Sequence, residues 1–283
     1  MTADLSPNLL TDHHILITGG GSGLGAAMAQ HFAAHGAQVT ICGRTKEKLD
    51  TVVGTITDNG QQANGIPADI RDIEAVEALF SQAEELFGPI TALVNNAAGN
   101  FLCPTESITP RGFDAIVGTN LYGTFNCTQT AGKRWISNNI PGRVVSIVTT
   151  YASIGSAFVV PSAVSKAGIV ALTRSLAVEW GRNQIRLNAI APGPVPTEGA
   201  FSRLVPTPEI EANLKSRVPL GRFGEPTEVA DLAAFLLSDL SSYLTGEVIA
   251  LDGGEHLAVG GQFNDLLRMP PEALKALLSS MRK

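Results

Sequence analysis

Cysteine, aromatic residues and basic charge are all scarce in this chain of 283 residues. Its three cysteines, Cys42, Cys103 and Cys127, are unclustered and do not suggest a disulfide framework. With 20 basic and 26 acidic residues the formal charge is −6, so the chain lacks the basic stripe that binds nucleic acid. No uninterrupted apolar run reaches the roughly 18 residues that span a membrane. We therefore expect neither a nucleic-acid nor a membrane partner.

Patterns for metal binding and for targeting are also missing. None of the five histidines stands at metal-ligand spacing from a cysteine or a carboxylate, so we expect no metal site. The first residues, Met1 to Leu5, lack the basic and apolar regions of a secretory signal. The last three residues are not a Ser-Lys-Leu peroxisomal signal. We expect a cytoplasmic protein.

Strand-like apolar runs alternate with helical patterns along most of the chain. This alternation predicts an α/β fold, a single Rossmann-type doubly wound domain over residues 1–283, with a mostly parallel seven-stranded sheet and helices on both faces. The expected strands are 14–18, 38–42, 64–68, 92–94, 144–149, 186–190 and 248–251, and expected helices include 25–35, 72–87, 163–180 and 226–237. Residues 192–219 and those after Gly254 look irregular, which suggests a substrate loop over about 192–223 and a C-terminal tail over 255–283.

A glycine-rich turn between the first expected strand and helix predicts a dinucleotide site. Glycines there let backbone amides approach a pyrophosphate at a helix N-terminus. The expected contacts are Thr18, Gly19, Gly21, Ser22, Gly23, Leu24 and Gly25. The second strand then ends in Cys42-Gly43-Arg44, where an NAD site normally carries an acidic residue. Because Arg44 suits a 2′-phosphate, we predict NADPH as the cofactor.

Three more segments complete a family resemblance. Asp69 follows the third strand, Asn95-Asn96-Ala97-Ala98-Gly99 the fourth, and Pro192-Gly193-Pro194-Val195-Pro196-Thr197 the sixth. Together with the glycine turn, these segments resemble the short-chain dehydrogenases/reductases over about residues 12–254. The resemblance implies further cofactor contacts at Asp69, Asn96, Ala97, Lys166, Pro192, Gly193, Val195 and Thr197.

The catalytic segment departs from the usual pattern of that family. Ser162 stands four residues before Lys166, where ordinary members carry tyrosine. A serine hydroxyl is too weak an acid to replace a phenol. Of the three tyrosines, we expect Tyr122 to be in the core and Tyr243 to serve packing. Tyr151, just past the fifth strand, is therefore the best available phenol.

This displaced tyrosine resembles the arrangement in 2,4-dienoyl-CoA reductases of the mammalian mitochondrial type. The resemblance runs through residues 95–101, 149–152, 155–163, 199–204 and 262–266, although Asn120 and Tyr122 look more like ordinary family members. It implies that Tyr151 and Asn100 bind the thioester oxygen and that Lys166 and Ser162 hold the nicotinamide ribose. It places the acyl-CoA contacts at Arg71, Phe101, Thr109 and Arg203.

The leading hypothesis is thus an NADPH-dependent 2,4-dienoyl-CoA reductase that assists β-oxidation of unsaturated fatty acids. A 2-enoyl-CoA reductase is the nearest alternative. Two others remain open: a carbonyl or 3-hydroxyacyl dehydrogenase using Thr149 and Lys166, and a non-catalytic NADP-binding paralogue. By family analogy we expect a homotetramer built partly through helices at residues 121–137 and 163–180.

Overall fold

The protein forms one seven-stranded parallel sheet, as the sequence predicts. The computed structural model describes residues 6–197, 207–258 and 260–281. The strand order is β3-β2-β1-β4-β5-β6-β7, and every pairing is parallel. The strands are β1 His14–Thr18, β2 Gln38–Gly43, β3 Ala63–Pro67, β4 Ala92–Asn95, β5 Arg143–Ile147, β6 Arg186–Pro192 and β7 Val248–Leu251.

Helices connect the strands and continue beyond the last one. The α-helices are α1 Gly23–Ala34, α2 Lys46–Asp58, α3 Ile73–Phe87, α4 Pro110–Val117, α5 Gly123–Asn138, α6 Tyr151–Ile154, α7 Val160–Trp180, α9 Pro208–Arg217, α10 Pro226–Leu237, α11 Glu255–Ala258 and α12 Pro271–Ser280. Shorter turns are η1 Thr105–Ser107, the π-helix η2 Gly118–Tyr122, η3 Gly181–Asn183, η4 Asp239–Ser241 and η5 Asn264–Arg268. No helix in the described part of the chain is long and apolar enough to cross a membrane.

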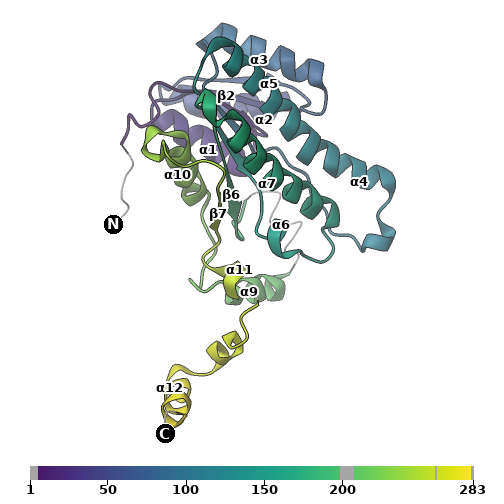
Figure 1. Cartoon of the computed structure of the whole chain (residues 1–283), viewed down its shortest axis with the longest axis vertical. Helices are drawn as coiled ribbons and strands as arrows, with labels where there is room; N and C mark the ends of the chain where they lie inside the picture. Colours follow the sequence, from purple (N-terminus) through teal and green to yellow (C-terminus); the bar gives the residue numbers. More distant parts are fainter. Residues whose placement is uncertain (1–5, 198–206, 259, 282–283) are drawn as a thin grey trace.

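Helices cover both faces of the sheet (Figure 1). Successive residues of β1 point to opposite faces, so Ile15 and Ile17 join one core and Leu16 joins the other. The first core packs α1, α2 and α10 against the sheet, whereas the second packs α3 and α5. Because both faces of the central strands are buried, β1 and β4 are mainly apolar along their length rather than alternating. The Rossmann-type doubly wound prediction is confirmed.

Two segments expected to be irregular contain helices, so that expectation was wrong. The proline-rich segment holds α9, which Thr207 caps by accepting a hydrogen bond from the Ile210 amide at 3.4 Å. Pro208 opens this helix, a position where proline's missing N–H costs nothing. The tail holds α11, η5 and α12, and α12 stands away from the body of the molecule (Figure 1). Proline content misled the prediction because proline also begins helices.

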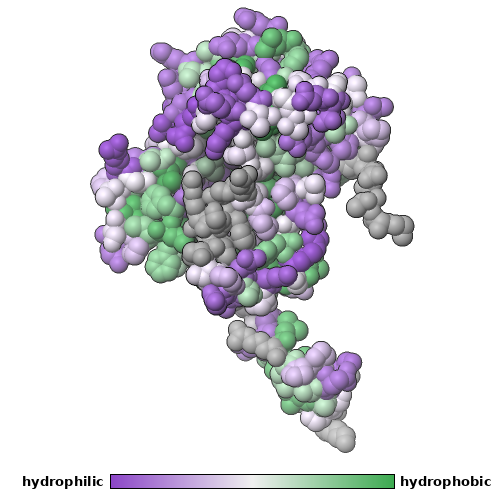
Figure 2. All heavy atoms as spheres, turned by 180° about the vertical axis from the view of Figure 1, so that it is seen from behind, coloured by the Kyte–Doolittle hydropathy of each residue, from purple (hydrophilic) through white to green (hydrophobic). Residues whose placement is uncertain are grey.

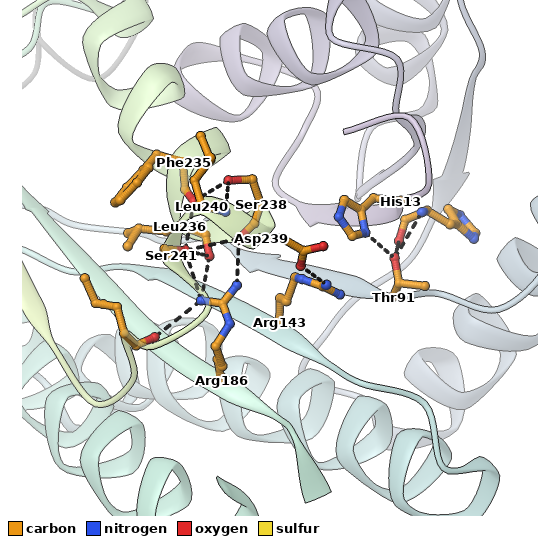
Figure 3. A network of polar contacts seen from close by, with 12 residues as sticks. His13, Thr91, Arg143, Arg186, Phe235, Leu236, Ser238, Asp239, Leu240 and Ser241 are labelled. Carbon is orange, nitrogen blue, oxygen red and sulfur yellow. Dashed lines mark hydrogen bonds and ion pairs between the residues drawn. The ribbon is translucent and has the colours of Figure 1, made fainter. Parts of the chain in front are cut away.

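A polar network ties together the amino-terminal ends of the strands (Figure 3). The Arg186 guanidinium, at the start of β6, donates to the carbonyls of Leu236 and Ser238 at 3.0 Å each, near the end of α10. Arg143, at the start of β5, pairs with Asp239 at 2.6 Å. His13 Nδ1 lies 3.2 Å from Thr91 Oγ1, and burial together with the Arg143 charge lowers the His13 pKa to about 4. This network is structural and lies at the edge of the sheet opposite the carboxyl ends of the strands.

Candidate active site

The predicted site residues gather where the strands end. The strand order reverses between β1 and β4, and ligands of doubly wound sheets bind at the carboxyl ends beside such a switch point. The glycine turn follows β1, Arg44 follows β2, Asn96 follows β4 and Tyr151 follows β5. Residues separated by more than a hundred positions in the sequence therefore share one edge.

Backbone conformation and close packing favour glycine at several positions of the turn. Gly19 has a φ of +67°, a left-handed conformation that glycine adopts without strain. A Cβ at Gly25 would lie 2.3 Å from the Gly19 carbonyl oxygen, so the turn and α1 can pack this closely only without one. Ser22, the N-cap of α1, makes no side-chain cap bond within the described residues, and the first turn carries no acidic residue. The helix N-terminus thus suits an anionic pyrophosphate.

Two loops converge on this turn from later in the chain. The Thr18 hydroxyl accepts hydrogen bonds from the backbone amides of Asn96 and Ala97, each at 3.0 Å, and Asn96 Nδ2 donates to the Thr18 carbonyl at 3.0 Å. Thr197, after β6, lies so close to the turn that a Cβ on Gly23 would be 3.6 Å from its hydroxyl oxygen. The structure therefore brings together the glycine, asparagine and proline motifs.

Charge at the end of β2 and β3 is arranged around Asp69. Arg71 Nε donates to Asp69 at 2.9 Å, and this hydrogen bond, followed by the nearby Arg71 and Arg44 charges, holds the Asp69 pKa below its usual value. In this structure Arg71, expected to contact the acyl-CoA, is therefore engaged with Asp69. Arg44 itself is exposed and open toward solvent, which fits a 2′-phosphate.

Three polar side chains meet past the end of β5. Tyr151 begins α6, and its hydroxyl lies 3.3 Å from Asn100 Nδ2 and 3.1 Å from Ser162 Oγ. Asn100 comes from the loop after β4, whereas Ser162 comes from the first turn of α7. Asn100 Nδ2 donates to the Tyr151 hydroxyl oxygen. The two groups are therefore close enough for both to donate to one substrate oxygen, which is what an oxyanion hole requires.

Lys166 lies one helical turn after Ser162 and is only 6% exposed. Its ammonium donates to the Ile147 carbonyl at 2.5 Å. Burial lowers the Lys166 pKa to about 8, because an ammonium in an apolar interior loses its hydration. An ammonium carries three N–H donors, so beyond its bond to Ile147 it has the capacity to donate to ribose hydroxyls.

Asn120 supports the Asn100 loop in a way that the sequence did not indicate. Its side chain accepts from the Gly99 amide at 2.8 Å and donates to the Gly99 carbonyl at 3.0 Å. Asn120 is fully buried in η2, where the wider π-helical turn interrupts the regular helix between α4 and α5. Asn100 follows directly, so this contact fixes the loop that presents the amide. Motif matching marked Asn120 as shared with ordinary family members, and only the fold reveals its partner.

The other residues predicted to contact the substrate or cofactor differ in what the structure shows of them. Thr109 caps α4, with its hydroxyl accepting from the Gly112 amide at 3.1 Å, so it has a structural role besides any substrate contact. The Phe101 amide donates to Asn100 Oδ1 at 2.9 Å. Gly193 packs against Asp252 so closely that a Cβ would lie 2.7 Å from the Asp252 backbone. Arg203 falls in 198–206, outside the described residues.

Two expectations about tyrosine were wrong. Tyr122, expected in the core, is 62% exposed, and Tyr243, expected to serve packing, is fully exposed. Both errors arise because a single residue's burial depends on which way its helix or turn faces, and local sequence does not settle that. Tyr151 is half-buried and is the tyrosine that meets Asn100 and Ser162.

Comparison with known proteins gives a consistent result. The family model described as Enoyl-(Acyl carrier protein) reductase matches residues 19–256. A Bacillus subtilis protein named a probable 2,4-dienoyl-CoA reductase, (2E)-enoyl-CoA-producing, is 44% identical over 86% of this chain and 96% of its own length. The peroxisomal 2,4-dienoyl-CoA reductase of Danio rerio, named as (3E)-enoyl-CoA-producing, is 36% identical over 93% of this chain and 87% of its own length.

Solved structures agree with the sequence matches. A short chain dehydrogenase from Bacillus anthracis is 41% identical, with a TM-score of 0.82 over 89% of this chain and 99% of that one. A gluconate 5-dehydrogenase from Burkholderia cenocepacia, in complex with NADP and tartrate, is 30% identical with a TM-score of 0.84 over 90% and 99%. The fold, the glycine turn and these matches together show that the chain belongs to the short-chain dehydrogenase/reductase family and is an oxidoreductase of that family.

Proposed function

We propose that the protein is an NADPH-dependent 2,4-dienoyl-CoA reductase in which Tyr151 and Asn100 stabilise the reacting thioester. The observation that carries the proposal is the contact between the Tyr151 hydroxyl and Asn100 Nδ2 at 3.3 Å. Ser162 occupies the place where an ordinary member of the family has its catalytic phenol, so the acid of carbonyl reduction is missing there. The Bacillus subtilis and Danio rerio relatives carry this activity in their names.

The chemistry of a conjugated thioester suits two neutral donors. NADPH, when bound, supplies a hydride. Addition at C5 of a 2,4-dienoyl thioester moves negative charge to the thioester oxygen, and the Tyr151 O–H and Asn100 N–H groups donate to that oxygen. Such donors stabilise charge that develops in the transition state, and the loss of one typically costs on the order of 10²- to 10³-fold in rate. Protonation at the α-carbon then gives a 3-enoyl-CoA.

The cofactor proposal rests on three parts of the chain. The glycine turn and the open N-terminus of α1 suit the pyrophosphate, and Arg44 suits the 2′-phosphate. Lys166 and Ser162 would hold the nicotinamide ribose. Asp69, Ala97, Pro192, Gly193, Val195 and Thr197 would line the rest of the cofactor site.

A 2-enoyl-CoA reductase is the second candidate, favoured by the description of the matching family model. Both reactions place charge on a thioester oxygen, so the Tyr151–Asn100 pair serves either. They differ in the acyl group that fits and in the position of hydride addition. Comparing a dienoyl with a simple enoyl thioester separates the two. The position of the remaining double bond, 2E or 3E, also differs between the names of the relatives and can be read from the product by NMR.

The direct test is Tyr151→Phe, which removes one oxygen atom. We expect kcat with NADPH and 2,4-hexadienoyl-CoA to fall on the order of 10²- to 10³-fold. Tyr243→Phe is the matched control, because Tyr243 is exposed and away from the Asn100–Ser162 contact, and it should keep wild-type activity. Equal activity in both variants would contradict the proposed role of Tyr151.

The setting of the reaction is part of the same proposal. We propose a cytoplasmic homotetramer that acts beside β-oxidation of unsaturated fatty acids. Exposed apolar residues on α5 and α7, including Phe125, Ile136 and Val178, support subunit contacts at these helices. Sedimentation velocity measures how many chains assemble, and a mass matching one chain would contradict the proposed homotetramer.

A further inference from the structure

Three large apolar side chains that lie close in sequence to Asn100, Tyr151 or Ser162 are exposed. Leu102 is 50% exposed, Ile154 is 53% exposed and Phe158 is 56% exposed. Leu102 and Phe158 lie in loops, and Ile154 ends α6; all three segments follow strands at the edge of the sheet where the predicted site lies. A group of exposed apolar side chains next to a site commonly marks a binding surface.

These residues are closely tied to the polar groups of the site. Leu102 lies two residues after Asn100, and Ile154 ends the helix that Tyr151 begins. Phe158 stands four residues before Ser162, whose Oγ lies 3.1 Å from the Tyr151 hydroxyl. The Cys103 amide donates to the Phe158 carbonyl at 2.9 Å and so joins the two loops. Leu102 and Phe158 therefore stand on two loops that are fastened together beside the reacting position.

The backbone at Phe158 is held in an unfavourable conformation. Its φ is +66°, in the left-handed region that side chains other than glycine and asparagine rarely adopt. The other non-glycine residues with positive φ in the described part of the chain are Asn139 and Gln184, both polar. Strain of this kind persists where the surroundings hold it and clusters at ligand sites. At this strained position the Phe158 side chain is 56% exposed.

The two segments that include these loops carry no charged side chain. Residues 95–104 and 151–165 contain no Asp, Glu, Lys or Arg, although 16% of the whole chain is charged. An alkyl chain suits such a surface, whereas the phosphates of coenzyme A do not. In Figure 1, α4 and the loop before it lie on the right. Figure 2 views the molecule from behind, so this side is on its left, where hydrophobic (green) surface is visible.

We propose that Leu102, Ile154 and Phe158 form a wall for the acyl chain beyond the reacting diene, so that the preferred substrates carry medium or long chains. This inference rests on the proposed function and names the substrate class of the same site. The alkyl chain covers side chains that are otherwise in water, and each methylene buried against them adds to affinity. Phe158 is the specificity-determining residue because the strained backbone positions its ring.

The test is Phe158→Asn, compared on 2,4-hexadienoyl-CoA and 2,4-decadienoyl-CoA with NADPH. Asparagine tolerates the left-handed conformation, so the loop should keep its shape while the ring is lost. We expect KM for the ten-carbon substrate to rise about tenfold, with KM for the six-carbon substrate changed less than about twofold and kcat unchanged for both. Leu86→Gln on α3 is the control for removing one exposed apolar side chain elsewhere, and it should change neither KM.

A binding measurement separates this inference from the proposed function. Calorimetry with NADP⁺ and the saturated thioesters hexanoyl-CoA and decanoyl-CoA needs no turnover. Tighter binding of decanoyl-CoA that Phe158→Asn removes would support the wall even if neither dienoyl substrate reacts. Equal affinity of the wild type for the two thioesters would overturn the inference. An equal loss of affinity for hexanoyl-CoA and decanoyl-CoA in Phe158→Asn would also overturn it. A variant that changes only the sedimentation coefficient would assign the surface to subunit contact and also overturn it.

Discussion

Replacing Lys166 with methionine removes the charge that is buried most deeply in the predicted site. The ordinary lysine pKa of 10.5 falls to about 8 in the fold because burial disfavours the ammonium form. The difference of about 2.5 pH units corresponds to about 3.4 kcal/mol, at ~1.36 kcal/mol per unit. Below pH 8 both folded and unfolded chains carry the charge, so the whole cost opposes folding. Between pH 8 and 10.5 the folded chain loses its proton first, and the cost disappears.

The stability of Lys166→Met relative to the wild type should therefore depend on pH. At pH 7 the variant is free of the desolvation cost, although it also loses the hydrogen bond to the Ile147 carbonyl. Between pH 7 and pH 10 the stability of the wild type should rise relative to that of the variant by about 2.5 kcal/mol. Because this is a difference between two pH values, the effects of methionine packing and of the lost hydrogen bond largely cancel.

Urea unfolding of both proteins, without cofactor and at one protein concentration, measures this change. The variant should also be unable to reduce substrate at the wild-type rate, since Lys166 is predicted to hold the nicotinamide ribose. A stability difference that stays constant from pH 7 to pH 10, or that moves in the opposite direction, would refute the claim that Lys166 is a buried ammonium.

Two further predictions concern the cofactor and the opposite edge of the sheet. Arg44→Gln should raise KM for NADPH about 10- to 100-fold and leave KM for NADH nearly unchanged, because a charge-assisted contact with the 2′-phosphate is lost. Equal changes in KM for the two cofactors would contradict the proposal that Arg44 binds the 2′-phosphate. His13→Asn should reduce the acid sensitivity of folding. The His13 pKa is lowered from 6.5 to about 4, so the stabilisation that neutral His13 brings is present above pH 6.5 and is lost as the pH falls toward 4. Between pH 7 and 4.5 the wild type should lose about 2 kcal/mol more than His13→Asn, measured by urea unfolding; parallel losses would contradict the burial of His13.

The predictable part of this fold follows from local patterns. The seven expected strands match the seven observed ones within a few residues, because central strands buried on both faces are mainly apolar. The glycine turn was recognisable because positive φ at Gly19 and Gly23 and the close approach of Gly25 to the Gly19 carbonyl favour glycine there. Tyr151 was predicted by elimination, since Ser162 cannot act as a phenol and few other tyrosines exist.

The unpredictable part depends on contacts between distant segments. The contact of Asn120 with Gly99 joins residues 21 positions apart through a π-helical turn that no periodicity indicates. The pairing of Arg71 with Asp69 changes what each residue has available for a ligand. The strained φ of Phe158 and its bond to the Cys103 amide are also products of the assembled loops. These features support or modify the site rather than define it.

The central claim is that the displaced tyrosine serves a conjugated thioester and not a ketone. The most direct measurement follows NADPH oxidation with 2,4-hexadienoyl-CoA, crotonyl-CoA and acetoacetyl-CoA as separate substrates. The account predicts turnover of the dienoyl thioester, with little or no turnover of the other two substrates. In Tyr151→Phe the dienoyl turnover should fall on the order of 10²- to 10³-fold. Turnover of acetoacetyl-CoA in place of the dienoyl thioester would contradict it, and would mean that Thr149, Lys166 or another group carries out ordinary carbonyl reduction.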